Sequence, residues 1–168
     1  MTFKFLIGFL FGLLTVYGVI VFSSKIDKTM SNNTIILSGM VFSLFVNALL
    51  TTLTSLFHED LKSITMWQMG SFSMKGFSSV KAIIPFIIIG LIGILIYSRE
   101  MDILTFGEEQ AKAVGVDTTK VKKRLFIFSA ILTGSSVALS GTIGFVDLIA
   151  PHIVRRMFGS KHIYVIPM

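Results

Sequence analysis

Residues 5–22 read FLIGFLFGLLTVYGVIVF, an uncharged run between Lys4 and Lys25. A helix that crosses the hydrocarbon core of a bilayer needs about 20 mostly apolar residues, and this run approaches that length. No small-residue cleavage site of the A-x-A kind follows it, so the run predicts a membrane helix and not a removed signal peptide. The start of the sequence therefore indicates an integral membrane protein.

Further apolar runs cover residues 34–57, 82–97 and about 125–140. In the run 82–97, Gly90 and Gly93 are expected to allow close approach of another helix. The next stretch, 141–157 (GTIGFVDLIAPHIVRRM), is too polar and too interrupted to face lipid. Because irregular backbone at membrane depth persists only inside protein or beside a wet cavity, we expect a short helix in the bundle interior here. The sequence predicts an all-α, polytopic transmembrane helix bundle of about four spans plus this interior helix, folded as a single domain over residues 1–168.

Composition supports this class. Hydrophobic residues make up 53% of the 168 residues and charged residues only 14%, whereas soluble domains carry about 25% charged residues. The absence of cysteine excludes disulfides, thiolate metal sites and cysteine nucleophiles. The net charge of +6 does not predict nucleic-acid binding, because its basic residues lie in the gaps between apolar runs and not on one folded face.

The distribution of Lys and Arg predicts the orientation. Eleven of the 15 basic residues lie in 24–33, 99–124 and 155–161, the loops that would share one side of the membrane. Because cytoplasmic loops carry the excess of basic residues, residues 103–123 are predicted to be cytoplasmic and 58–79 to be outside. Within the second run, Asn47, Thr51 and Ser55 recur at every fourth residue and so share one helical face; such a stripe belongs against another helix.

The cytoplasmic segment, residues 103–123, contains the run TFGEEQAKAVGVDTTKVKK. A short helix can begin at Thr105 or Gly107, and Gly115 suits its C-terminal cap. Asp117 or Thr118 can then cap a second short helix that leads into the fourth span. A charged connector is usually just solvated, but two capped helices bearing small and apolar side chains favour a docking site for a soluble partner.

Four stretches resemble one transporter family. The run LTFGEEQAKAVG (104–115) is similar to the cytoplasmic coupling segment of permeases that import iron-siderophores, haem and cobalamin by ABC transport. The run LTGSSVALSGTIGFVDLIAPHIVRRMFGSKH (132–162) resembles the longest signature of that family, known as the FecCD type. Two weaker landmarks, LSGMVFSLFVNALLT (37–51) and MWQMGSF (66–72), agree in order and spacing.

The resemblance implies part of a ten-span type II ABC importer permease, truncated at both ends, in a bacterial plasma membrane. Its expected partners are cytoplasmic ATPase subunits, a second permease subunit, an extracytoplasmic substrate-binding protein and the lipid bilayer. The expected substrate is an iron chelate (siderophore or haem) or cobalamin. The resemblance implies that ATP hydrolysis belongs to a partner subunit, so the chain itself is expected not to be an enzyme and to hold no catalytic residue, metal or cofactor. No Walker A pattern occurs in it, as this expectation requires. In the family, Asp147 commonly corresponds to Gly.

The resemblance also implies site residues. The residues expected to contact the ATPase, within what we call the coupling segment (103–123), are Phe106, Gly107, Glu108, Glu109, Ala111, Gly115 and Val116. The residues expected to line the pathway or to pack beside it are Asn47, Gly134, Ser135, Ser140, Gly141, Gly144, Pro151 and His152.

Three other interpretations were weighed. Ser140 and His152 could serve an intramembrane protease, but a Ser in a Gly-rich helix is more often a packing residue. Asp147 and His152 are too few for a metal site; Asp147 more simply caps a helix beginning near Leu148 with Pro151 in its first turn. A truncated permease could also act as a non-transporting membrane scaffold or be an inactive remnant of a split gene, and this is the main alternative.

Overall fold

The computed structural model describes residues 2–27, 31–57, 61–71, 76–142, 144 and 146–167, and these residues contain helices but no strand. The all-α prediction is therefore confirmed for them. The helices are α1 (Thr2–Ile26), α2 (Asn32–Leu56), α3 (Leu61–Gln68), α4 (Phe77–Ile96), α5 (Ser98–Leu104), α6 (Glu108–Ala113), α7 (Thr118–Ser140), α8 (Val146–Phe158) and α9 (His162–Val165).

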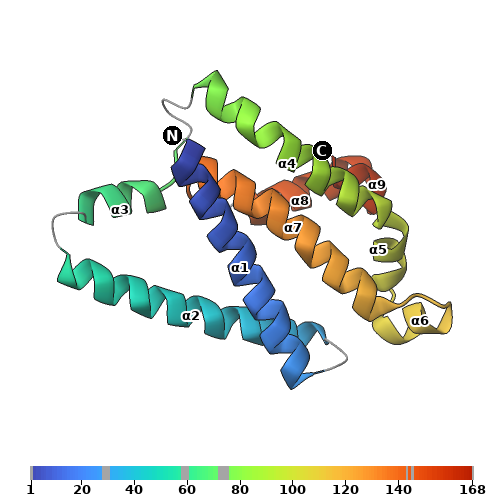
Figure 1. Ribbon diagram of the computed structural model, residues 1–168. Coiled ribbons are helices and arrows are strands. Elements are labelled where there is room, and N and C mark those ends of the chain that lie inside the picture. The colour runs from blue at the N-terminus through green and yellow to red at the C-terminus, as the bar shows by residue number, and fades with distance from the viewer. Residues whose placement is uncertain are drawn as a thin grey trace.

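Helices α1, α7 and α4 run side by side and form the centre of the bundle (Figure 1). Glycines allow these helices to approach one another. A Cβ at Gly12 would lie 3.7 Å from the Cα of Gly134, and one at Gly8 would lie 3.8 Å from the Cβ of Ala138. The α1–α7 contact is therefore a backbone-close interface of small residues, the kind that stabilises helix pairs in membranes.

The α4–α7 contact is closer still. A Cβ at Gly90 would lie 2.6 Å from the Cγ of Leu132, and one at Gly93 would overlap the ring of Phe128. The rings of Phe9 and Phe86 add a contact between α1 and α4, with 4.6 Å between their centroids. The close approach expected from the glycines of the third apolar run is thus made against α7.

Among the described residues, two helices are individually long and apolar enough to cross a membrane, namely α1 from Ile7 and α2. A third span is obtained if α4 from Val80 and α5 are counted together across the 53° bend between them. The expected fourth span, residues 125–140, is the second part of α7. Its apolar stretch is shorter than 18 residues, and the turns before it carry Lys120, Lys122, Lys123 and Arg124.

Helix α8 differs from the sequence prediction in where it begins and in the position of its proline. Helix α8 begins at Val146, so Asp147 is inside its first turn and Pro151 lies in its interior. Its apolar side chains, Leu148 and Met157 among them, are largely exposed and α9 is its main neighbour, so α8 does not pass through the interior formed by the described residues. The described residues do not test whether α8 lies in the interior of a larger bundle, so that placement stays a prediction.

Candidate functional site

The coupling segment folds as a compact turn between two membrane helices. Gly107 precedes α6 as its N-cap residue, and Glu108 and Glu109 occupy the first turn. After α6 the N–H of Val116 donates to the carbonyl of Ala111 (3.0 Å), and the N–H of Gly115 donates to that of Lys112 (3.0 Å). This pair of bonds is a Schellman motif, and Gly115 occupies its left-handed position with φ +87°.

Asp117 starts the next helix. Its side chain accepts a hydrogen bond from the backbone N–H of Lys120 (3.1 Å) and forms an ion pair with the Lys120 ammonium (2.8 Å). These interactions with Lys120 lower the pKa of the Asp117 carboxyl. The expected second short helix does not exist separately, because Thr118 to Ser140 form one unbroken helix.

The predicted ATPase-contact residues divide into two sets. Ala111 is fully buried beneath the turn, and Glu108 pairs with Lys122, whose side chain is only 9% exposed. In contrast, Phe106 is 77% exposed and Glu109 is exposed. Gly115 is also exposed, while Gly107 and Val116 are half-buried. Val114, which is 68% exposed, adds an apolar side chain to this surface that the sequence analysis did not select.

A second polar link fixes α7 against the bend between α4 and α5. The Arg124 guanidinium donates to the hydroxyl of Tyr97 (2.6 Å) and lies 5.8 Å from the centre of its ring. The Tyr97 ring also stacks on Phe128, with 6.4 Å between centroids. Together with Glu108–Lys122, this link holds both α6 and the bend between α4 and α5 against α7.

A third link, which the sequence analysis missed, reaches the far end of the chain. An oxygen of Asp102, on α5, accepts the backbone N–H of His162 (3.0 Å) and lies 2.5 Å from the Nδ1 atom of its ring. His162 is 8% exposed. Because the two residues are 60 positions apart and belong to no periodic pattern, no sequence signal indicated the pair.

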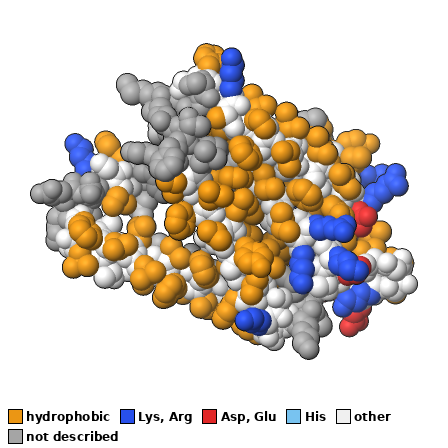
Figure 2. Space-filling view, viewed as in Figure 1, with side chains coloured by type: hydrophobic (Ala, Val, Ile, Leu, Met, Phe, Trp, Pro, Cys, Tyr) orange, Lys and Arg blue, Asp and Glu red, His pale blue; other side chains and the backbone are white. Residues whose placement is uncertain are grey.

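Charge also gathers at this end of the molecule. Figure 2 shows Lys and Arg side chains beside Asp and Glu over the region of α5, α6 and the start of α7, while apolar side chains cover the middle of the visible face. Basic residues from separate parts of the sequence thus share one end of the molecule. That this end is cytoplasmic stays a prediction from their number.

The predicted pathway residues are not brought together. Asn47 is exposed on α2, whereas Gly134 and Ser135 lie within α7 and Ser135 is fully buried. The Ser140 hydroxyl donates to the carbonyl of Ser136 (2.9 Å). Beyond α7, Gly141 is buried and Gly144 exposed; Pro151 and His152 are exposed on α8.

The outer end of α7 contacts the residues that follow α3. The N–H of Ser71 donates to the carbonyl of Ser140 (2.6 Å), and the Thr142 hydroxyl donates to the carbonyl of Gln68. Ser140 therefore takes part in a backbone junction. The exposed His152 makes no described contact with it, so the geometry gives no support to a Ser–His nucleophile. Among the described residues, no group of three or more His, Asp or Glu side chains is placed to hold a metal ion.

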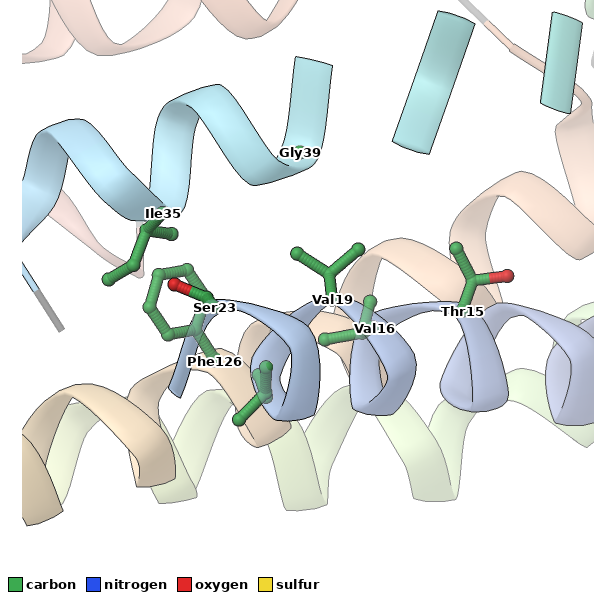
Figure 3. Close-up of a pocket in the computed structure, with 8 residues that line it drawn as sticks. Thr15, Val16, Val19, Ser23, Ile35, Gly39 and Phe126 are labelled. Carbon is green, nitrogen blue, oxygen red and sulfur yellow. The ribbon is translucent and has the colours of Figure 1, made fainter. Parts of the chain in front are cut away.

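A separate apolar cavity of about 220 Å³ opens between α1, α2 and α7 (Figure 3). Thr15, Val16, Val19 and Ser23 of α1 face Ile35 and Gly39 of α2 across it, with the Phe126 ring of α7 at one end. None of the predicted pathway residues lines this cavity.

The comparisons with known proteins agree with this architecture. The model of the FecCD transport family matches residues 1–168, the whole sequence. The chain belongs to the FecCD transport family. It is 39% identical over 156 residues to the ABC transporter permease protein YvrB of Bacillus subtilis, a match that covers 93% of this chain and 44% of YvrB.

The names of two further similar proteins mention a substrate. The cobalamin import system permease protein BtuC of Halobacterium salinarum is 32% identical over 161 residues, covering 96% of this chain and 42% of BtuC. A solved inward-facing metal-chelate type ABC transporter is 32% identical with a TM-score of 0.85, covering 95% of this chain and 51% of that one. This FecCD chain therefore spans about half the length of the relatives it matches, and the predicted membrane location is confirmed by the family.

Proposed function

We propose that this FecCD chain is a permease component of an ABC importer that moves an iron chelate or cobalamin across the plasma membrane of a bacterium. The substrates named for its relatives, cobalamin and a metal chelate, support this class. A second permease subunit would complete the pathway, and an extracytoplasmic binding protein would deliver the substrate. ATP hydrolysis would belong to separate cytoplasmic subunits, and this chain would not be an enzyme.

The observation that carries the proposal is the exposed surface of the coupling segment. Phe106 and Val114 present large apolar side chains to the aqueous side of the chain, where burial against a partner is worth about 1.5–3 kcal/mol for each. Helix α6, which lies between these two residues, is held to α7 by Glu108–Lys122, and the bend before α5 is held to α7 by Tyr97–Arg124. A partner that binds Phe106 and Val114 would therefore act on a rigid structure and could tilt α7.

The test is co-purification of the chain with its candidate ATPase subunit from detergent. Phe106→Ala and Glu109→Lys change the exposed surface, and each is expected to abolish or strongly weaken binding. Lys62→Glu is the matched control: it reverses an exposed charge on α3, at the opposite side of the membrane, and should leave binding unchanged.

The structure also shows why Glu108 should not be reversed in this experiment. Glu108 pairs with a buried lysine, so Glu108→Lys would place two positive charges together and damage the fold of the turn. If both surface variants bound the ATPase subunit as strongly as the wild-type chain does, the proposed docking surface would be contradicted. A correctly inserted wild-type chain that binds no ATPase would instead favour a scaffold or an inactive remnant.

A further inference from the structure

Helix α9 lies between the coupling segment and α8. Within the described part of the chain, α8 makes its extensive helix contact with α9, and α9 in turn packs against α5. Helix α9 has only four residues, His162–Val165, and its N-cap residue Lys161 provides no side-chain hydrogen bond. The first helical N–H of α9 is instead satisfied by Asp102 of α5.

In the Asp102–His162 pair the imidazole is buried, whereas the Asp102 side chain is 37% exposed. The same carboxylate oxygen binds both the backbone N–H and the ring Nδ1 of His162, and the His162 side chain is 10% exposed. A buried imidazole that loses its carboxylate partner leaves a polar nitrogen unsatisfied. The two-point contact also fixes the orientation of α9, because backbone and side chain are held by one acceptor.

The three polar links around the coupling segment have different targets. Glu108–Lys122 joins α6 to α7, and Tyr97–Arg124 joins the residue that precedes α5 to α7. Asp102–His162 joins α5, which leads into the coupling segment, to α9 and so to α8. A displacement of α5 and α6 would therefore reach α7 by two links and the α8–α9 pair by one.

We propose that Asp102 and His162 are positioning residues that transmit the movement of the coupling segment to α8 and α9. This inference rests on the proposed function, because the movement requires an ATPase subunit that acts on the segment. Lys161, the neighbouring positive charge, lies close enough to act on Asp102 but belongs to the α9 side of the link. Movement of α7 alone would then be insufficient for transport.

The test uses the complete transporter reconstituted with its ATPase, measuring transport and ATP hydrolysis separately. Asp102→Ala should retain ATPase binding and hydrolysis, while transport per ATP falls about fivefold or more, the range of a typical coupling free energy between sites. Asp102→Asn, which keeps an oxygen acceptor for the His162 N–H, should lose less. Equal retention of the ATPase by all variants checks that the membrane fold is intact.

A covalent replacement of the link makes the test decisive. The chain contains no cysteine, so Asp102→Cys and His162→Cys together introduce the only thiols of this chain. In the reduced state the double variant should transport as poorly as Asp102→Ala. Adding an oxidant to form the disulfide should restore transport. Reducing the disulfide again with dithiothreitol should abolish the restored transport. Transport by each single cysteine variant should change neither with the oxidant nor with dithiothreitol.

Normal coupling in Asp102→Ala would overturn the inference. So would a crosslinked double variant that stays uncoupled, or an Asp102→Ala chain that loses the ATPase, since the pair would then only support folding of the docking surface. Failure of the unmodified chain to bind the ATPase would be a different result: it would remove the proposed function and this inference with it.

Discussion

Gly93 shows how closely the packing of two membrane helices can depend on one missing methyl group. The face of α4 at Gly93 lies against the Phe128 ring, which is itself stacked on Tyr97. The ring therefore has little freedom to move away from an added Cβ. A side chain at this position would force α4 and α7 apart next to the bend that leads into the coupling segment.

We expect Gly93→Ala to destabilise the folded chain by about 1–3 kcal/mol, the usual cost of overpacking a close interface. The measurement is thermal unfolding in detergent. Gly39→Ala on α2 is the matched control, because nothing lies within 4 Å of a Cβ there; it should be neutral or stabilising by up to about 1 kcal/mol. Equal melting temperatures for the two variants would show that α4 and α7 are less closely packed.

Gly115 tests backbone conformation instead of packing. Its φ of +87° is unfavourable for other residues, but nothing lies within 4 Å of a Cβ built on it. Gly115→Val should therefore cost about 1–2 kcal/mol through backbone strain alone and shift the exposed end of α6. We expect ATP hydrolysis to continue while transport per ATP declines. An unchanged ratio of transport to ATP hydrolysis in Gly115→Val would contradict this role. The control is Gly18→Val on α1, where nothing lies within 4 Å of an added Cβ; this variant should keep the wild-type ratio.

At the scale of elements, α7 differs most from the two-helix arrangement read from the sequence. Asp117 caps it, and no Gly or Pro interrupts the residues from Thr118 to Thr133. The cap sequence correctly marked a helix start. The expected boundary before the apolar run was wrong, because the change from charged to apolar residues reflects a change of surroundings along the helix and not a change of backbone.

The Asp117 cap has a pH dependence of defined sign. The interactions with Lys120 lower the pKa of this carboxyl from 3.8 in the folded state. Its contribution is therefore fully present above pH 3.8 and is lost as the pH falls through the lower, folded pKa. As the pH is lowered, the backbone amides in the first turn of α7 should exchange faster in the wild-type chain than in Asp117→Asn. The asparagine amide can cap the helix but does not titrate. Identical acid profiles would exclude the cap as the titrating group.

At the scale of the whole molecule, the orientation can be measured directly. Because the chain has no native thiol, Lys112→Cys on α6 and Lys62→Cys on α3 each give one accessible label site. In intact cells a membrane-impermeant maleimide should label Lys62→Cys and spare Lys112→Cys until the membrane is opened. The reverse pattern would invert the topology and place the coupling segment outside.

The sequence predicted those features that depend on local pattern. The apolar runs, the glycine contacts of the third run and the Gly115 cap each follow from residues close together in the chain. Asp102–His162 and Tyr97–Arg124 could not be predicted, since their partners are 60 and 27 positions apart. The ATPase contacts and the pathway residues stay predictions, although the structure separates exposed Phe106 from buried Ala111.

The unbroken course of α7 has a mechanical consequence. Its 23 residues rise 1.5 Å each and so form a rod about 35 Å long, comparable to the thickness of the hydrocarbon core. One end begins at Asp117 beside the coupling segment, and the other is bonded to Ser71 through the carbonyl of Ser140. A tilt of about 5° at the inner end would displace the outer end by about 3 Å over that length. If the coupling segment moves as proposed, a small swing at one end of α7 would therefore become an atom-sized displacement at the other.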